Sequence, residues 1–371
     1  MSLRCALWGA IATSLWFTSA VATEEPLFSV PVQYANNTYS LYLVTYATEV
    51  SRADFCIFAT SAYARGFRIN VLGQASRFRK YGWPDRVWTL RKFTKIIPDE
   101  PNAIVVFMDS YDSIINSSPQ RLVAAFVDAG ARVLFSSERG CGGTKWDLKR
   151  LDNTCDSLWP VPPVKTTMPF LNSGGFMAFR PELAALLGVC RKEHRAHQRS
   201  LLPGERNAYV IAGDQQLYSQ LFSYGMAERT ADDKSRGALR AALGMSLDYQ
   251  SQIFLSMYKV DLDTEIRYTA NGTLVTTGLT YCSHLDRRMY YEACLGVQPK
   301  TTVPVVVHLN GKHKPLKEVA RRLGGRHDKA LWDARIWLVA GEQPTVADVC
   351  GGHVGGCPPE MTPWACLSER L

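Results

Sequence analysis

Short apolar runs alternate with segments of helical character along most of the chain. A β-rich run over 40–45 feeds a loop, and a second short strand over 67–73 ends at a glycine. The segments 55–65 and 87–97 have the pattern of helices. Residues 103–108 are apolar throughout, which is typical of a central strand covered on both faces. This alternation predicts parallel βαβ units, and therefore an α/β fold with a mostly parallel sheet flanked by helices.

The same alternation continues toward the C-terminus. It predicts helices over 119–129 and 214–224 and strands over 132–136, 175–179 and 303–307. The basic segment 192–207 has no apolar period, so we expect an exposed insertion there. The pattern weakens after residue 325, and 349–371 is rich in Gly, Pro and Cys. We expect a main domain over 23–325 and a small disulfide-linked appendage within 326–371.

The N-terminus has the pattern of a secretory signal peptide. One basic residue, Arg4, precedes an apolar stretch that ends in the small-x-small pattern Ala20-Val21-Ala22. A transmembrane anchor is the alternative, but Ser and Thr interrupt the run, which favours removal of residues 1–22. No later segment approaches the length of an apolar span. We therefore expect a location in the lumen of the secretory pathway, in the endoplasmic reticulum or Golgi, or secretion.

Charge and cysteine content agree with that location. The formal net charge is +8, and it falls to +7 when Arg4 is removed. An excess this small is typical of a solvated surface, and a lumenal protein is not expected to bind nucleic acid. Nine of the ten cysteines remain, without a tight Cys-x-x-Cys pair, so structural disulfides are favoured over zinc. Glycosylation sequons begin at Asn36, Asn116 and Asn271.

Two carboxylates follow the buried strand 103–108 directly. In open α/β sheets ligands lie beyond the carboxyl ends of the strands, so Asp109 and Asp112 are well placed to hold a hard divalent cation. Such a cation could bridge the phosphates of a nucleotide sugar and stabilise the departing diphosphate. The alternative is a loop whose Asp and Ser residues form turns.

A second polar string, His308 to Pro315, follows the late strand. Imidazole can complete a metal site with the two aspartates, Gly311 permits close approach to phosphate, and Lys314 can neutralise a diphosphate. The alternative for His308 is a polar loop residue. The association of His308, Gly311 and Lys314 with the upstream aspartates favours the functional interpretation.

Two further motifs offer polar groups for a sugar. The string Phe170–Phe176 is predicted to be a glycine-rich bend in which Asn172 offers hydrogen bonds to hydroxyls. Asp214 begins a helix and could be the carboxylate nearest an anomeric carbon. A tight turn and a helix N-cap are the respective structural alternatives.

In this order, the motifs resemble the glycosyltransferase domain of the multifunctional procollagen lysyl hydroxylases. The resemblance covers about Leu41 to Pro315, and its strongest strings are Asp109-Ser110-Tyr111-Asp112 and Phe170–Phe176. It also includes Leu134–Glu138 and the pair Ser246–Asp248 with Ile253-Phe254. The string His308-x-x-Gly-x-x-Lys-Pro is similar to glycogenin-like retaining transferases as well. The resemblance implies a GT-A-type fold.

The resemblance also implies roles for individual residues. The Mn²⁺ ligands would be Asp109, Asp112 and His308. Tyr111 would stack near the uracil, with Thr45 close to the nucleoside, and Gly311 and Lys314 would contact the diphosphate. Asn172 and Asp214 would line the sugar and acceptor side. The sequence departs from the family's pattern at two places. Ala212-Gly213 stand where the family has acidic residues, and Arg86 stands where it has a lysine.

We therefore expect a retaining, metal-dependent hexosyltransferase. The donor would be UDP-glucose or UDP-galactose, and the acceptor a protein or glycan hydroxyl, with collagen-like hydroxylysine or its galactosyl derivative favoured by the resemblance. A glycogenin-like transferase with another acceptor is the first alternative. An inactive lectin-like or scaffold protein is the second, because a fold does not guarantee function. Hydroxylation is not expected, because the chain has no room for the oxygenase domain.

Overall fold

The computed structural model describes residues 27–74, 83–140, 159–200, 213–223, 237–270, 273–279 and 300–310, with the backbone of 337–338. The side chains of 197–200 are not described. The predicted signal peptide, the sequon at Asn271 and the diphosphate residues Gly311 and Lys314 lie outside the described residues, as does the predicted appendage apart from 337–338.

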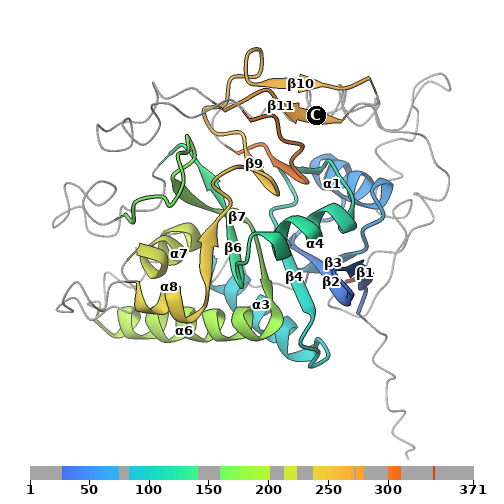
Figure 1. Cartoon of the computed structure of the whole chain (residues 1–371). Helices are drawn as coiled ribbons and strands as arrows, with labels where there is room; N and C mark the ends of the chain where they lie inside the picture. Colours follow the sequence, from blue (N-terminus) through green and yellow to red (C-terminus); the bar gives the residue numbers. More distant parts are fainter. Residues whose placement is uncertain are drawn as a thin grey trace, which may run out of the picture.

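One large mixed sheet forms the centre of the molecule (Figure 1). Its strands are β1 (Val30–Tyr34), β2 (Asn37–Tyr46), β3 (Ile69–Leu72), β4 (Ala103–Met108), β5 (Ser113–Ile115), β6 (Val133–Glu138), β7 (Phe170–Phe179), β8 (Met245–Leu247), β9 (Phe254–Ser256), β12 (Val306–His308) and β13 (Trp337–Leu338). The main path runs β13-β3-β2-β4-β7-β6-β9-β12-β5, with β1 paired to β2 and β8 to β6. A separate hairpin consists of β10 (Ile266–Tyr268) and β11 (Leu274–Thr276).

The pairing confirms the expected α/β, GT-A-type architecture. The pairs β2–β3, β2–β4, β6–β8, β6–β9, β9–β12 and β3–β13 are parallel. Strand β7 is the exception in the middle of the sheet, because it runs antiparallel to both β4 and β6. Strands β1 and β5 add antiparallel pairs with β2 and β12.

Helices cover both faces of the sheet. They are α1 (Ala53–Ala64), α3 (Trp83–Ile96), α4 (Pro119–Asp128), α6 (Arg180–Ser200), α7 (Asp214–Ser223) and α8 (Ala238–Ala242). Alternate residues of β4 show the division: Ile104 and Val106 join a core cluster with α1 and α4, whereas Val105 and Phe107 join one with α3, α6 and α7. Burial on both faces explains why the sequence of β4 is apolar throughout.

Two expectations about local structure were wrong. Phe170–Phe176 is not a bend but the first part of strand β7, and the pairing of β6 with β7 shifts register between Phe135 and Ser136. Helix α6 continues to Ser200, so 192–200 is helical and not part of an insertion loop. Both segments place polar residues at buried positions, which obscures the apolar period.

The pair Ser246–Asp248 and Ile253-Phe254 has a structural explanation. The buried carboxylate of Asp248 accepts backbone N–H groups of Gln252 (3.0 Å), Ile253 (2.7 Å) and Phe254 (2.8 Å), which holds the turn between β8 and β9. Of the cysteines in the described ranges, Cys56 is disulfide-bonded and Cys190 is a buried free thiol. Among the helices of the described part of the chain, none is long and apolar enough to cross a membrane.

Candidate metal and nucleotide-sugar site

Asp109, Asp112 and His308 converge at the ends of neighbouring strands. Asp109 follows β4, Asp112 precedes β5, and His308 ends β12, which pairs antiparallel with β5 so that His308 lies opposite Ser113. The backbone N–H of Leu309 also donates to the carbonyl of Asp112 (2.7 Å). Sheet pairing therefore brings residues from distant parts of the sequence together.

These three side chains form a compact set of potential ligand atoms. One atom from each lies within 4.8 Å of the others, and His308 Nε2 is 3.3 Å from Asp112 Oδ1. The His308 ring is buried, while the side chains of Asp109 and Asp112 keep 28% and 13% of their surface exposed. The set is therefore open on the carboxylate side and closed behind the imidazole.

Gly174 leaves the space that the His308 ring occupies. A Cβ atom built on Gly174 would lie 2.0 Å from His308 Cε1, which no side chain could tolerate without movement of the ring. The carbonyl of Gly174 accepts the backbone N–H of Asp109 (2.7 Å). The glycine of β7 thus permits close packing against His308 and holds the start of the Asp109 loop.

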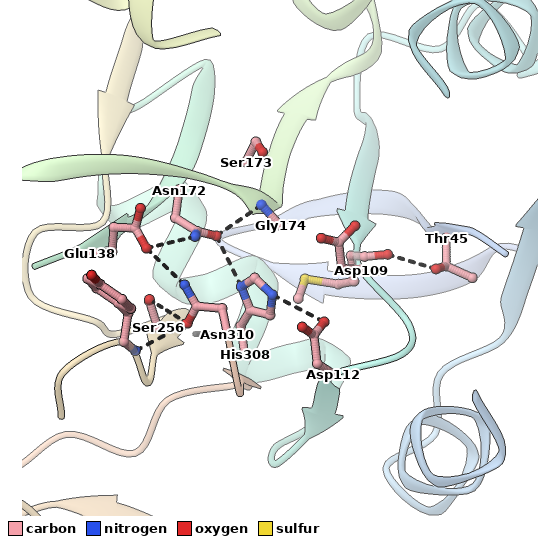
Figure 2. A network of polar contacts seen from close by, with 12 residues as sticks. Thr45, Asp109, Asp112, Glu138, Asn172, Ser173, Gly174, Ser256, His308 and Asn310 are labelled. Carbon is pink, nitrogen blue, oxygen red and sulfur yellow. Dashed lines mark hydrogen bonds and ion pairs between the residues drawn. The ribbon is translucent and has the colours of Figure 1, made fainter. Parts of the chain in front are cut away.

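A second layer of polar groups supports His308 (Figure 2). Asn172 Oδ1 lies 3.0 Å from His308 Nδ1, and Asn172 Nδ2 donates to Glu138 Oε2 (3.0 Å). Asn310 Nδ2 donates to the same Glu138 oxygen (2.8 Å), and Gln215 Nε2 donates to Oε1 (2.6 Å). Asn172 is 3% exposed, so its amide is directed toward this network instead of outward.

Arg86 connects Asp109 of the candidate metal-ligand set with Asp214 of helix α7. Its Nη1 lies 3.1 Å from Asp109 Oδ1 and 2.9 Å from Asp214 Oδ2. Ser173 Oγ donates to the other Asp214 oxygen (3.3 Å). Asp214 is therefore an ion-pair partner at the beginning of α7, beside the cluster, and its carboxylate is held between a cation and a hydroxyl.

Burial and charge shift the titration of several groups. Burial raises the pKa of Asp109, and the positive charges of Arg86 and His308 offset only part of that effect. Burial acts to lower the pKa of His308, but the hydrogen bond and charge of Asp112 outweigh it, so the pKa is raised. Burial raises the pKa of Glu138 to about 7, against the effect of its amide donors. Perturbed groups gathered at a sheet edge are typical of functional sites.

The two residues expected near the nucleoside have other partners as well. The Thr45 hydroxyl is buried and donates to the carbonyl of Met108 (2.7 Å), which fixes the strand end before Asp109. Tyr111 exchanges hydrogen bonds with the backbone of Glu49 (3.0 Å each), and its ring lies 4.4 Å from the Arg52 guanidinium carbon. Their nucleoside roles stay predictions, as do those of Gly311 and Lys314.

Sequence reasoning did not assign a role to Glu138, Asn310 or Gln215. A signal was present for Glu138, because it is an acidic residue at the carboxyl end of a buried parallel strand, as Asp109 is. Asn310 belongs to the same string as His308. Gln215 follows Asp214 and reaches Glu138 only because α7 packs against β7 beside β6.

The comparisons with known proteins match part of the chain to one family of domains. Residues 37–199 match the family described as the PLOD GT domain. This match confirms the resemblance that the motifs indicate and supports a PLOD-like glycosyltransferase domain. The matched segment contains Asp109, Asp112 and Asn172, whereas His308 lies beyond it.

Curated relatives match a larger part of the chain, and their names refer to procollagen lysine. The human protein "Multifunctional procollagen lysine hydroxylase and glycosyltransferase LH3" is 26% identical over 303 residues, which cover 80% of this chain and 32% of that protein. A Drosophila melanogaster "Procollagen-lysine,2-oxoglutarate 5-dioxygenase" is 28% identical over 246 residues, which cover 63% of this chain and 29% of that protein. The chain therefore spans about a third of the length of these relatives.

Among solved structures, a "glycosyltransferase involved in the glycosylation of the major capsid of PBCV-1" aligns with 76% of this chain and 96% of its own, at 9% identity and a TM-score of 0.36. A similarity at this level adds nothing to the argument about function.

Proposed function

We propose that this protein is a metal-dependent, retaining glycosyltransferase that transfers glucose or galactose from a UDP-sugar to a hydroxyl acceptor. The observation that carries the proposal is the cluster of Asp109, Asp112 and His308 at the strand ends. Its support is the match of residues 37–199 to the PLOD GT domain.

The ligand set suits Mn²⁺. Two of the three ligands are carboxylates, which hard divalent cations prefer, and imidazole is an acceptable third. Ligand atoms within 4.8 Å of one another can be bridged by metal–ligand bonds about 2.0–2.6 Å long. When bound, the cation would supply positive charge that stabilises the departing diphosphate. Asp109 and Asp112 would hold it from the exposed side and His308 from the buried side.

The remaining residues divide between the nucleotide and the sugar. Tyr111 and Thr45 would lie near the nucleoside, and Gly311 and Lys314 near the diphosphate. Asp214 would face the anomeric carbon and the acceptor, since it lies beside the cluster and shares Arg86 with Asp109. Asn172 would support this side from behind, through His308.

The proposed acceptor is hydroxylysine, or galactosyl-hydroxylysine, in a collagen-like protein. The support is the names of the relatives, which refer to procollagen lysine. The proposed location is the lumen of the secretory pathway, after removal of residues 1–22, and the proposed transferase domain is 23–325, followed by the appendage 326–371. A glycogenin-like transferase with another acceptor is the second candidate, favoured by the His308–Pro315 string and by Ala212-Gly213 in place of acidic residues.

A matched pair of variants tests the proposal. Asp112→Asn should abolish Mn²⁺-dependent UDP binding, because a neutral amide is a poorer ligand for a hard cation, and turnover of UDP-glucose and UDP-galactose should fall with it. Asp214→Asn should keep UDP affinity within about threefold while turnover falls at least tenfold. Calorimetry with UDP and Mn²⁺, and donor hydrolysis with and without hydroxylysine peptides, measure both effects.

The alternatives give different results. A lectin-like or scaffold protein would show no Mn²⁺-dependent UDP binding in the wild type. Unchanged Mn²⁺-dependent turnover in Asp112→Asn would exclude the metal assignment. Equal losses of UDP affinity and turnover in Asp214→Asn would place that carboxylate on the nucleotide side. Donor hydrolysis without transfer to hydroxylysine would keep the transferase class and favour another acceptor.

A further inference from the structure

Glu138 collects amide donors from three separate parts of the chain. Its Oε2 accepts from Asn172 in β7 (3.0 Å) and from Asn310 after β12 (2.8 Å), and its Oε1 accepts from Gln215 in α7 (2.6 Å). The residue is 4% exposed, and its hydrogen-bond partners within the described residues are these amides and not the three potential metal ligands. Because a carboxylate oxygen can only accept, each amide that contacts Glu138 must turn its NH₂ group toward it, which fixes the orientation of that amide.

The orientation of the Asn172 amide follows from two independent contacts. Glu138 accepts at Oε2, so the Asn172 group that faces it is the NH₂. The backbone N–H of Gly174 donates to the other end of the amide at 2.9 Å, and only an oxygen can accept there. Asn172 Oδ1 is therefore the atom that faces His308 Nδ1 at 3.0 Å (Figure 2).

This orientation determines how His308 can act. Because Asn172 Oδ1 is an acceptor, His308 Nδ1 must carry a proton and donate it. The nitrogen that remains for a cation is Nε2, which lies on the side of Asp112 at 3.3 Å. The hydrogen bond at Nδ1 also limits rotation of the His308 ring about its Cβ–Cγ bond.

We propose that Glu138 is a positioning residue that, through the amide of Asn172, holds His308 with its proton on Nδ1 and with Nε2 directed at the metal cluster. The proposal deepens the proposed function, because it takes His308 as a metal ligand. It predicts that metal affinity depends on a residue that never contacts the metal. Partners of this kind behind metal-binding histidines typically change affinity by about 10–100-fold.

The acceptor oxygen, and not the charge, is the feature of Glu138 that the relay needs. A glutamine at 138 can keep one oxygen toward Asn172 and Asn310 and turn its NH₂ toward Gln215, whose own amide can reverse at the loss of the long contact from the Ser173 N–H to its Oε1 (3.5 Å). A leucine at 138 offers no acceptor to any of the three amides. Glu138→Gln and Glu138→Leu therefore separate hydrogen-bond orientation from the electrostatic effect of a buried carboxylate.

The experiment measures Mn²⁺ binding to the full chain by electron paramagnetic resonance of the free ion, without turnover. Glu138→Leu should weaken binding about 10–100-fold, and Glu138→Gln should stay within about threefold of the wild type. Gln215→Leu is the matched control, since it removes a donor to Glu138 without touching Asn172, and its Mn²⁺ affinity should also stay within about threefold. Thermal melting of each variant checks that it is folded.

A spectroscopic measurement on the wild type covers the case in which Glu138→Leu does not fold. With diamagnetic Mg²⁺ bound, ¹⁵N-resolved spectra of the imidazole should show His308 protonated at Nδ1. Protonation at Nε2 instead would overturn the proposal, and so would wild-type Mn²⁺ affinity in folded Glu138→Leu. Equal losses in the Leu and Gln variants, or an equal loss in Gln215→Leu, would also overturn it. A wild type that binds no Mn²⁺ would overturn both this relay and the proposed metal site.

Discussion

Arg86 shows how one side chain can serve two parts of a site. A single nitrogen, Nη1, contacts both Asp109 and Asp214. Burial acts to lower the pKa of this guanidinium, but the two carboxylates outweigh burial and keep the pKa above its ordinary value. Because one nitrogen makes both contacts, the planar fork of arginine is not needed for them, and the ammonium of a lysine could replace it.

The sequons at Asn36 and Asn116 have opposite environments. Asn36 is exposed in the turn between β1 and β2 and has a positive φ of 65°. Asn116 is 1% exposed; its Nδ2 donates to the carbonyls of Leu274 (2.9 Å) and Pro304 (2.8 Å), and its Oδ1 accepts the N–H of Leu274. The amide nitrogen that a glycan would occupy is therefore part of the fold at Asn116 and accessible at Asn36.

We predict that protein produced through the secretory pathway carries a glycan at Asn36 and none at Asn116. Mass spectrometry before and after enzymatic deglycosylation measures this. Asn36→Gln should remove one glycan mass, whereas Asn116→Gln should remove none and should lower stability by about 1–3 kcal/mol, because buried backbone groups lose their partners. A glycan on Asn116 of the folded protein would contradict the buried environment.

At the scale of elements, the close approach of Gly174 in β7 to His308 at the end of β12 determines the position of the imidazole. We predict that Gly174→Ala displaces the His308 ring and lowers Mn²⁺ affinity at least tenfold, since the added Cβ would lie 2.0 Å from Cε1. Isothermal titration of Mn²⁺ into the variant measures the effect.

The matched control is Gly188→Ala in helix α6, where an added Cβ would meet nothing within 4 Å. This change should leave Mn²⁺ affinity unchanged and raise stability by about 0.5–1 kcal/mol, because alanine is the better helix former. Wild-type affinity in Gly174→Ala, with the fold intact, would show that the ring has room to move.

Helix α6 shows what the sequence pattern conceals at this scale. Leu183, Leu186, Leu187 and Cys190 are buried, and His194 continues the same stripe one turn later at 2% exposure. The helical period of buried positions therefore persists beyond Arg191. Because the buried position there is the polar His194, a pattern based on apolar residues alone ends the helix too early. The strand β7 was misread for a related reason, because its buried positions include Asn172, Ser173 and two glycines.

For the whole molecule, most elements and the convergence of Asp109, Asp112 and His308 could be predicted, but the supporting contacts could not. Strand β4 is recognisable from its uninterrupted apolar run, and the rule for strand ends then points to Asp109 and Asp112. The contacts of Glu138 with Asn172 and Asn310 join residues far apart in the chain. They depend on strand order and on the antiparallel direction of β7, which the pattern does not encode.

Stability of the whole fold should depend on pH through His194. Burial, with a smaller effect of Arg195, lowers the pKa of this imidazole to about 4, and its ring lies 5.2 Å and 5.7 Å from the rings of Trp83 and Trp88 in α3. The unfolded chain, with an ordinary pKa near 6.5, binds the proton more readily. His194 therefore contributes stability that is present above about pH 6.5 and is lost as the pH falls toward about 4.

As the pH falls, the free energy of unfolding should decrease by about 1–3 kcal/mol because of His194. Urea unfolding at pH 7 and at pH 5 measures it in the wild type and in His194→Leu. The variant should lose the part of the pH dependence that His194 causes, because leucine has no proton to bind. An equal change in the free energy of unfolding between pH 7 and pH 5 in both proteins would exclude His194 as the cause.

The place of β12 in the sheet has a consequence for biosynthesis. Strand β12 lies between β9 and β5, and His308 is carried at its end, long after Asp109 and Asp112 in the chain. During translation, Asp109 and Asp112 are therefore synthesised well before His308. The nascent chain cannot bring the three proposed ligands together until β12 pairs with β9 and β5. Under the proposed function, a chain would therefore bind the cation tightly only after β12 has joined the sheet. Chains at an earlier stage of synthesis would not compete for the metal.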